Sequence, residues 1–203
     1  AWEMVTHELA VLCGLNVPEA KCERFSKNGS TFLVKRFDRT PENKRIHIIS
    51  AMTALGKIDG NNAQDGTSYL DIVQCIQQQG SKPKEDLLEL WKRIVFNIAV
   101  TNTDDHLRNH GFLFDQKGLR LSPMYDVNPN PDGVGLSLNI DDMDNSLSFD
   151  VAIEAAKFFD IKKDEAVKIA DAIKQNVKQW KAVAEKFGIS RSDMLRVENC
   201  FRF

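Results

Sequence analysis

Three oxygen-bearing side chains within one stretch of the sequence have the types and order that a magnesium-assisted transfer to a hydroxyl group requires. Asp104 and Asn109 lie in a polar cluster with four residues between them, and Asp126 follows after a short predicted hairpin. A carboxylate can accept the proton of an attacking hydroxyl. Mg²⁺ prefers oxygen ligands and usually takes only one or two carboxylates from a protein. The stretch therefore predicts Asp104 as a base, with Asn109 and Asp126 as metal ligands.

The spacing of these residues narrows the predicted chemistry to phosphoryl transfer. Asp-x-x-x-x-Asn is the spacing of a protein-kinase catalytic loop, after which a second metal-binding aspartate follows. Asp126 has that place, 22 residues after Asp104. Asp105 is an alternative base, but its separation from Asn109 does not match this spacing, so we favour Asp104. Such reactions depend mainly on positioning and charge neutralisation, so few residues are needed.

Other interpretations of the same residues stay open. Asp, Asn and Thr at a helix end are usually caps and turn formers. His106 and His110 have the i, i+4 spacing of a zinc-binding pair, but the Glu of the H-E-x-x-H motif does not lie between them. The run Asn128–Pro131 (NPNP) most simply forms a stiff loop that closes the region.

Two predicted elements must position these side chains. Alternating apolar residues predict a hairpin over 111–122, with Lys117 and Gly118 in its turn. A buried helix is predicted over about 83–100, ending just before the polar cluster. Its apolar face has the i, i+3, i+4 period and consists of Leu87, Leu90, Trp91, Ile94, Val95 and Ile98.

The rest of the chain is predicted to contain more helix than strand. The expected helices are at 2–13, at 69–79 and from 149 onward. In the last of these regions one apolar stripe ends at Gly188. Ser190 and Asp193 then resemble the capping box of a final helix. A second hairpin is expected from the strands 20–25 and 31–37 around an Asn-Gly turn, and the connecting segments are 38–48 and 59–66.

The composition is that of one globular domain and excludes several classes of protein. The chain has 203 residues, 42% of them hydrophobic and 28% charged, with a net charge of −2. A general nucleic-acid binder would usually be basic over the whole domain. We find no apolar run of membrane-spanning length and no secretory leader. The four cysteines are scattered and form no C-x-x-C pair, which favours a reducing compartment and a cytoplasmic location.

Several runs of the sequence closely resemble the HipA family of bacterial serine/threonine-protein kinases, the toxin halves of toxin–antitoxin pairs. The two most specific runs are 103–112 (TDDHLRNHGF) and 121–129 (LSPMYDVNP). The run 14–18 (GLNVP) resembles the turn after the family's αC-like helix, and 34–39 (VKRFDR) resembles its hinge. With 135–138 (GLSL) and the helical tail, the resemblance covers nearly the whole chain.

The resemblance implies ATP as the phosphoryl donor and Mg²⁺ as the cofactor. It implies that His106 orders the catalytic loop, so that His106 joins Asp104 among the catalytic residues. Glu3 falls where the αC-like helix carries an acidic residue, although a solvated helix charge explains it equally well. The hinge position that usually holds Glu is lysine here. Three residues would lie at the adenine, namely Lys35, Arg36 and Phe37. The backbone groups of the hinge would form hydrogen bonds with the edge of the base.

The resemblance also implies an α+β, mostly helical fold in two parts. These are a small N-lobe remnant at 1–38 and a kinase-like C-lobe at 39–203, with the catalytic hairpin at about 101–131. No glycine-rich loop or strand lysine precedes the first helix, so we expect a truncated chain or half of a split system. Because charge neutralisation at the phosphates is the main catalytic device, we expect the 203-residue chain alone to incorporate no labelled phosphate. Incorporation would show that the absent lobe is unnecessary.

The implied function is transfer of the ATP γ-phosphoryl group to a serine or threonine hydroxyl of a protein. The resemblance implies an antitoxin partner of the HipB type, DNA contact only through that partner, and no membrane partner. Relatives of this type act on aminoacyl-tRNA synthetases, but no residue here reads out that choice. Two alternatives stay open, namely a non-catalytic kinase-fold module that binds an antitoxin and a kinase of small-molecule hydroxyls.

Overall fold

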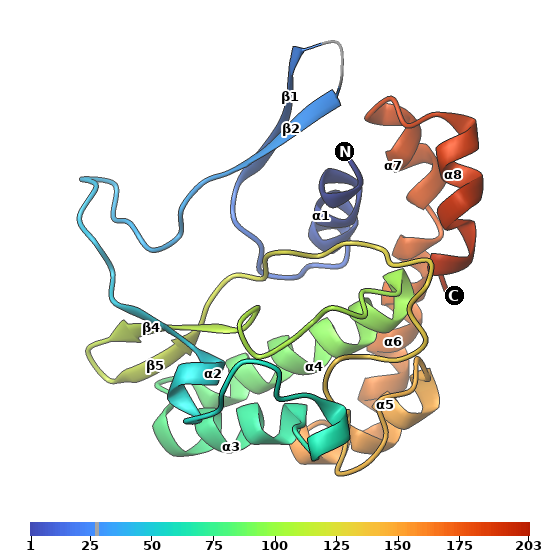
Figure 1. Ribbon diagram of the computed structural model, residues 1–203. Helices are drawn as coiled ribbons and strands as arrows, with labels where there is room; N and C mark the ends of the chain where they lie inside the picture. The colour runs from blue at the N-terminus through green and yellow to red at the C-terminus, as the bar shows by residue number, and fades with distance from the viewer. Residues whose placement is uncertain (27–28) are drawn as a thin grey trace.

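The helix α4 (Pro83–Val100) runs through the middle of the molecule and forms the centre of its core (Figure 1). In the computed structural model, which describes residues 1–26 and 29–203, the periodic side chains Leu90, Ile94 and Ile98 of α4 are completely buried. The helix packs against α3 (Tyr69–Gln79), α5 (Phe149–Ala155) and α6 (Lys163–Val177). The apolar period thus predicts both the helix and the face that it buries.

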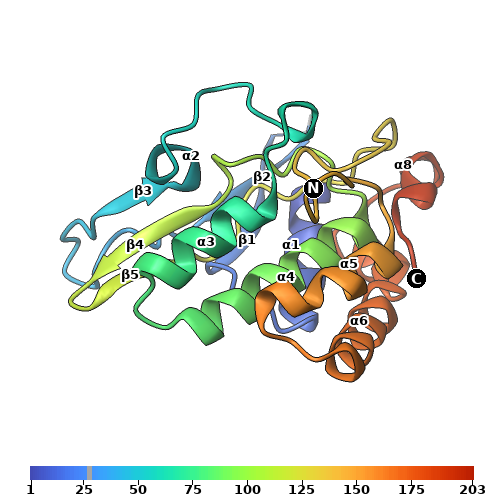
Figure 2. The same cartoon turned by 90° about the horizontal axis from the view of Figure 1, so that it is seen from below.

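Two small antiparallel sheets flank the helices (Figure 2). One is the hairpin of β1 (Ala20–Ser26) and β2 (Gly29–Val34), which lies beside α1 (Trp2–Leu12). The turn that the sequence predicts there falls partly on residues 27–28, which lie outside the described residues. The other sheet has the order β3-β4-β5, with β3 at Ile48–Ser50, β4 at Gly111–Asp115 and β5 at Gly118–Leu121.

The C-terminal third is helical but more divided than the sequence predicts. The apolar stripe up to Gly188 does not form one helix, because the chain breaks at 178–179 between α6 and α7 (Trp180–Lys186). Ser190 caps α8 (Arg191–Val197) by accepting a hydrogen bond from the Asp193 backbone N–H. The remaining short helices are α2 (Ala51–Ala54), η1 (Ala63–Asp65), η2 (Ala156–Phe159) and η3 (Glu198–Cys200).

Two local predictions are wrong by small amounts. The segment 38–48 is not only a connector, because its last residue begins β3, which pairs with β4. In the β4–β5 hairpin the turn residues are 116–117, and Gly118 is the first residue of β5, opposite Asp115. A Cβ atom at Gly118 would lie 2.4 Å from the Gln79 carbonyl oxygen, so close approach of the α3 end requires glycine there.

The mixed, mainly helical fold that the sequence predicts is confirmed. Among the described residues, no helix combines the length and apolar character that crossing a membrane requires.

Candidate active site

The loop that carries Asp104 and Asn109 begins directly after the end of α4. Thr101 ends the helix in a left-handed conformation, with φ of +51°, and its hydroxyl donates to the Cys200 carbonyl oxygen at 2.7 Å. The Asn102 backbone N–H still bonds back to the Asn97 carbonyl, at 2.9 Å. A non-glycine residue in this conformation needs such surrounding contacts to hold it. The loop therefore leaves the helix in a fixed direction.

Asp104 and Asn109 are joined directly within this loop. The Asp104 carbonyl oxygen accepts the His106 backbone N–H at 3.0 Å and the Asn109 side-chain Nδ2 at 3.2 Å. Asn109 is buried, whereas the Asp104 side chain is exposed. Because its amide nitrogen is occupied and no described residue donates to its Oδ1, the amide oxygen is left for a ligand.

Asp126 lies in the segment after β5, which runs between α1 and α4 (Figure 1). The Thr6 hydroxyl on α1 donates to the Val127 carbonyl at 2.5 Å, and the Asn128 N–H donates to Asn102 Oδ1 at 3.4 Å. Asp126 itself is exposed and has φ of +58°. A left-handed aspartate costs conformational energy, and such residues cluster at functional sites. Its left-handed backbone, directly before the two anchored residues Val127 and Asn128, is thus consistent with a functional role.

Tyr125 connects three parts of the site. Its hydroxyl donates to the Arg108 carbonyl in the Asp104 loop at 2.8 Å. Its ring stacks on Phe37, with centroids 5.5 Å apart and planes at 28°. The residue next to Asp126 therefore touches both the Asp104 loop and the hinge segment. These contacts bring all three segments together, and the Asp126 side chain forms no hydrogen bond with Asp104 or Asn109 among the described residues.

Asp104 and Asp126 differ from the carboxylates Asp38, Asp86 and Asp105 in having no partner among the described residues. No described residue forms a hydrogen bond or salt bridge with either carboxylate group. By contrast, Asp38, Asp86 and Asp105 all accept hydrogen bonds from side chains around them. Carboxylates that hold structure are normally paired in this way. The two exposed, unpaired carboxylates are therefore available to a ligand.

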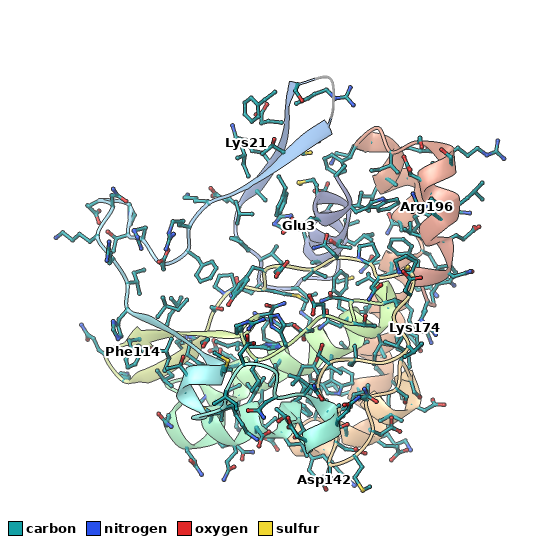
Figure 3. The ribbon with its side chains drawn as sticks, viewed as in Figure 1. Glu3, Lys21, Phe114, Asp142, Lys174 and Arg196 are labelled. Atoms are coloured by element: carbon teal, nitrogen blue, oxygen red, sulfur yellow. The ribbon has the colours of Figure 1, made fainter. Side chains whose placement is uncertain are left out.

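Negative charge gathers beside Asp126. A pocket between α1, the β1–β2 hairpin and the segment 124–127 is lined by Glu3, His7 and Asp126, among others. Glu3 lies on α1, above the Asp126 segment (Figure 3). Burial, and then the charge of Asp126, raise the pKa of the Glu3 carboxyl. No Lys or Arg of the described residues forms a salt bridge with Glu3, and the charge of the N-terminal amino group lowers its pKa only in part. Two carboxyl groups therefore lie close enough at this end of the site to affect one another.

The residues present fit a magnesium ion by the chemistry of their donor atoms. Asn109 offers an amide oxygen and Asp126 a carboxylate, both hard oxygen ligands of the kind that Mg²⁺ takes in small number from proteins. Among the described residues there is no cluster of three or more His, Cys, Asp and Glu side chains suited to a metal. The fit is therefore to an ion that completes its shell with water and phosphate oxygens.

The structure disfavours the two alternatives at the loop. Asp105 is buried and its Oδ2 accepts hydrogen bonds from three side chains, so it cannot reach an acceptor hydroxyl. His110 is buried too, with Nε2 bonded to Asp105 at 3.0 Å, so it is not placed to share a zinc ion with His106. His106 is half-buried, and its Nε2 accepts a hydrogen bond from Arg108 Nη2 at 3.2 Å.

The predicted hinge residues use their side chains for local ion pairs. Lys35 Nζ binds Glu19 at 2.8 Å, and its backbone N–H donates to the Glu19 carbonyl, also at 2.8 Å. Arg36 forms two hydrogen bonds with Asp38, at 2.8 and 2.5 Å. The backbone groups of Arg36 and Phe37 form no hydrogen bond with described residues. Of the three predicted residues, these two have backbone groups free to meet a purine edge.

Asp38 ties the hinge to the segment that follows, and this tie should be acid-sensitive. The hydrogen bond from Arg36 is the main cause that lowers the pKa of Asp38 to about 2. Because this lies below the value of about 3.9 for an unfolded aspartate, protonation favours the unfolded state. We expect the melting temperature of wild type to exceed that of Asp38→Asn at pH 6, and the difference to vanish between about pH 4 and pH 2. A difference that grows on acidification would contradict this assignment.

Comparisons with known proteins identify the family of the chain. A family model described as the HipA-like C-terminal domain matches residues 1–181. The chain belongs to this family. A Putative kinase Y4mE of Sinorhizobium fredii is 32% identical over 132 residues, which cover 62% of this chain and 31% of that protein. The serine/threonine-protein kinase toxin HipA of Shewanella oneidensis is 28% identical over 145 residues, covering 62% of this chain and 33% of the toxin.

Solved structures show that the HipA-like C-terminal domain fold extends over almost the whole chain. HipA in the Shewanella oneidensis complex of HipA, HipB and operator DNA aligns with 98% of this chain and 52% of its own, with a TM-score of 0.73 at 19% identity. The Helicobacter pylori proinflammatory kinase CtkA aligns with 96% of this chain and 86% of its own, with a TM-score of 0.58 at 15% identity. The chain thus spans about a third of the curated relatives and half of the HipA structure.

Sequence reasoning missed the residues that hold the site together. Tyr125 is predicted only as part of the run 121–129, and the sequence patterns assign no role to Tyr69, Asn97 or Asn102. Asn97 and Asn102 could have been singled out, because two amides near the end of an otherwise apolar helix are costly to bury without partners. Tyr69 gave no such signal, since it lies 36 positions from its partner Asp105.

Proposed function

We propose that this HipA-like domain is the catalytic part of a protein kinase that transfers the γ-phosphoryl group of ATP to a serine or threonine hydroxyl. The observation that carries the proposal is the paired loop geometry: an exposed, unpartnered Asp104 carboxylate whose own backbone carbonyl holds the Asn109 side chain. This is the arrangement that a base and a metal ligand need if they are to act on neighbouring atoms. The named kinases among its relatives support the same class of reaction.

Each residue has a defined task in this mechanism. Asp104 orients the acceptor hydroxyl and takes its proton as the oxygen attacks phosphorus. Asn109 and Asp126 would hold Mg²⁺, which when bound supplies charge neutralisation at the phosphate oxygens. His106 keeps the loop in shape through its contact with Arg108. Because the transition state spreads negative charge, fixed ligands placed in advance contribute more than mobile ones.

The nucleotide base would lie at the hinge, beside the segment that carries Asp126. We place residues 1–38 in a small N-lobe and 39–203 in the C-lobe, with the catalytic hairpin at about 101–131. The free backbone groups of Arg36 and Phe37 can pair with the adenine edge. The stack of Phe37 on Tyr125 supports this placement, because it sets the hinge next to the segment that carries Asp126.

The partners follow from the relatives and stay part of the proposal. The structure of HipA with HipB and operator DNA leads us to propose an antitoxin of the HipB type, with DNA reached only through it. The slightly acidic net charge of −2 supports indirect rather than direct DNA contact. An aminoacyl-tRNA synthetase is one protein substrate to test, in the cytoplasm.

The test of the proposed function is a phosphorylation assay of the complete natural polypeptide that carries residues 1–203. We expect Mg²⁺-dependent transfer of label from γ-labelled ATP to serine or threonine in protein, located by mass spectrometry. Label appearing only in small molecules would favour the alternative of a small-molecule kinase. Nucleotide-independent binding of an antitoxin without any transfer would favour a non-catalytic module.

A further inference from the structure

Asp105, between the proposed base and His106, is the centre of a buried hydrogen-bond network. Its Oδ2 accepts from the Tyr69 hydroxyl at 2.6 Å, from Asn97 Nδ2 at 2.7 Å and from His110 Nε2 at 3.0 Å. The three donors come from the start of α3, from α4 and from the residue before β4. Asp105 is only 3% exposed, and Tyr69 and Asn97 are completely buried. One carboxylate oxygen therefore joins three separate elements.

The network continues to the segment that carries Asp126. Asn97 Oδ1 accepts a hydrogen bond from Asn102 Nδ2 at 3.0 Å, and Asn102 Oδ1 accepts the Asn128 backbone N–H at 3.4 Å. Asn97 thus donates to Asp105 on one side and accepts from Asn102 on the other. This relay ends two residues from Asp126. It ties the loop after α4 to the segment after β5.

The same carboxylate is placed to order Asp104, Asn109 and the segment that carries Asp126. Asp104 is the direct neighbour of Asp105 in the chain. Asn109 precedes His110, whose ring donates a hydrogen bond to Asp105. Burial raises the pKa of Asp105, but His110 and the hydrogen bond from Tyr69 outweigh it and hold this pKa below its ordinary value. A buried anion with fixed donors holds one geometry, because each lost bond leaves a buried polar group unpaired.

We propose that Asp105 is a positioning residue, which through Tyr69, Asn97 and His110 fixes Asp104, Asn109 and the Asp126 segment in one arrangement before any ligand binds. The inference rests on the proposed function only in calling that arrangement catalytic. The network itself consists only of side chains of this chain. Asp105 does not touch the reacting atoms, and it acts through the backbone of its neighbours.

Hydrogen exchange of individual backbone amides in the complete natural polypeptide that carries residues 1–203 tests this role without substrate. The amides of His106 and Asn109 bond to carbonyl oxygens inside the loop, at 3.0 and 2.8 Å, and report its opening. We expect Asp105→Leu to speed their exchange at least tenfold. In Asp105→Asn these amides should exchange at least threefold more slowly than in Asp105→Leu, because the amide oxygen can still accept two of the three hydrogen bonds.

A matched control separates positioning from loss of stability. Asp86 is equally buried, at 3% exposure, and its carboxylate binds Arg120 and the Leu121 backbone N–H, away from the loop. Asp86→Asn should leave the His106 and Asn109 amides within threefold of wild type. Equal acceleration in Asp86→Asn, or no acceleration in Asp105→Leu, would overturn the proposal.

A second variant tests the relay if Asp105→Leu does not fold. Asn97→Ala removes one donor to Asp105 and the acceptor of Asn102, and leaves the bonds from Tyr69 and His110. We expect the Asn128 amide to exchange at least tenfold faster in this variant, and unchanged exchange of that amide would overturn the relay. Because these measurements need neither ATP nor Mg²⁺, a protein that fails to phosphorylate would refute the proposed function and leave this inference standing.

Discussion

Asp104→Asn should lower kcat for phosphoryl transfer by about 10²–10⁴-fold, with little change in KM for ATP. The amide has nearly the shape of the carboxylate but cannot take the hydroxyl proton. The Asp104 backbone carbonyl, which holds the Asn109 side chain and the His106 N–H, is unaffected by the substitution. The loss should therefore fall on the chemical step. Steady-state kinetics of the complete natural polypeptide measure it.

The control for Asp104→Asn is an equally exposed aspartate elsewhere on the molecule. Asp142 is exposed and forms no hydrogen bond or salt bridge with described residues. It lies at the far end of the molecule from α1 and the β1–β2 hairpin (Figure 3). Asp142→Asn should keep the wild-type kcat. A kcat for Asp104→Asn within about threefold of wild type would remove Asp104 from the role of base.

Substitution of Asp126 should abolish the magnesium-dependent part of nucleotide binding. A ligand at 100 times its Kd stabilises a protein by about 2.7 kcal/mol, or roughly 5–10 °C in melting temperature for a chain of this size. We expect ATP with Mg²⁺ to raise the melting temperature of the complete polypeptide by an amount of this order. In Asp126→Ala the increment due to Mg²⁺ should disappear.

The left-handed backbone at Asp126 requires a second variant. Alanine is strained at φ of +58°, whereas glycine is not. Asp126→Gly therefore removes the carboxylate without adding strain, and its melting temperature without ligand should be no lower than that of Asp126→Ala. Both variants should lose the Mg²⁺ increment equally. An Mg²⁺ increment that persists in Asp126→Gly would show that the carboxylate is not a ligand.

The elements of the fold that follow from local patterns could be predicted, and those set by tertiary contacts could not. The period of Leu90, Ile94 and Ile98 predicts α4 because one face of a helix must be buried. By contrast, β3 has only three residues and exists because β4 offers it hydrogen bonds. The break between α6 and α7 is similarly hidden, because the apolar stripe continues across it into Trp180.

The candidate site likewise has a local part that the sequence predicts and a long-range part that it does not. The spacing of Asp104 and Asn109 is a local property, and their contact through the Asp104 carbonyl is a turn that six residues can make. The contacts that order the site join residues far apart in the chain, such as Tyr69 with Asp105 and Phe37 with Tyr125. No spacing rule connects such pairs. They become visible only when the helices and hairpins are packed together.

The central claim is that Asn109 and Asp126 together hold a divalent cation at the phosphates of a nucleotide, with Asp104 beside it. The most direct test is a crystal structure of the complete natural polypeptide with Mn²⁺ and a non-hydrolysable ATP analogue, in which anomalous scattering locates the ion. We predict one ion about 2.0–2.3 Å from Asn109 Oδ1 and from an Asp126 carboxylate oxygen. An ion bound to the nucleotide with neither of these residues in its coordination shell would contradict the assignment.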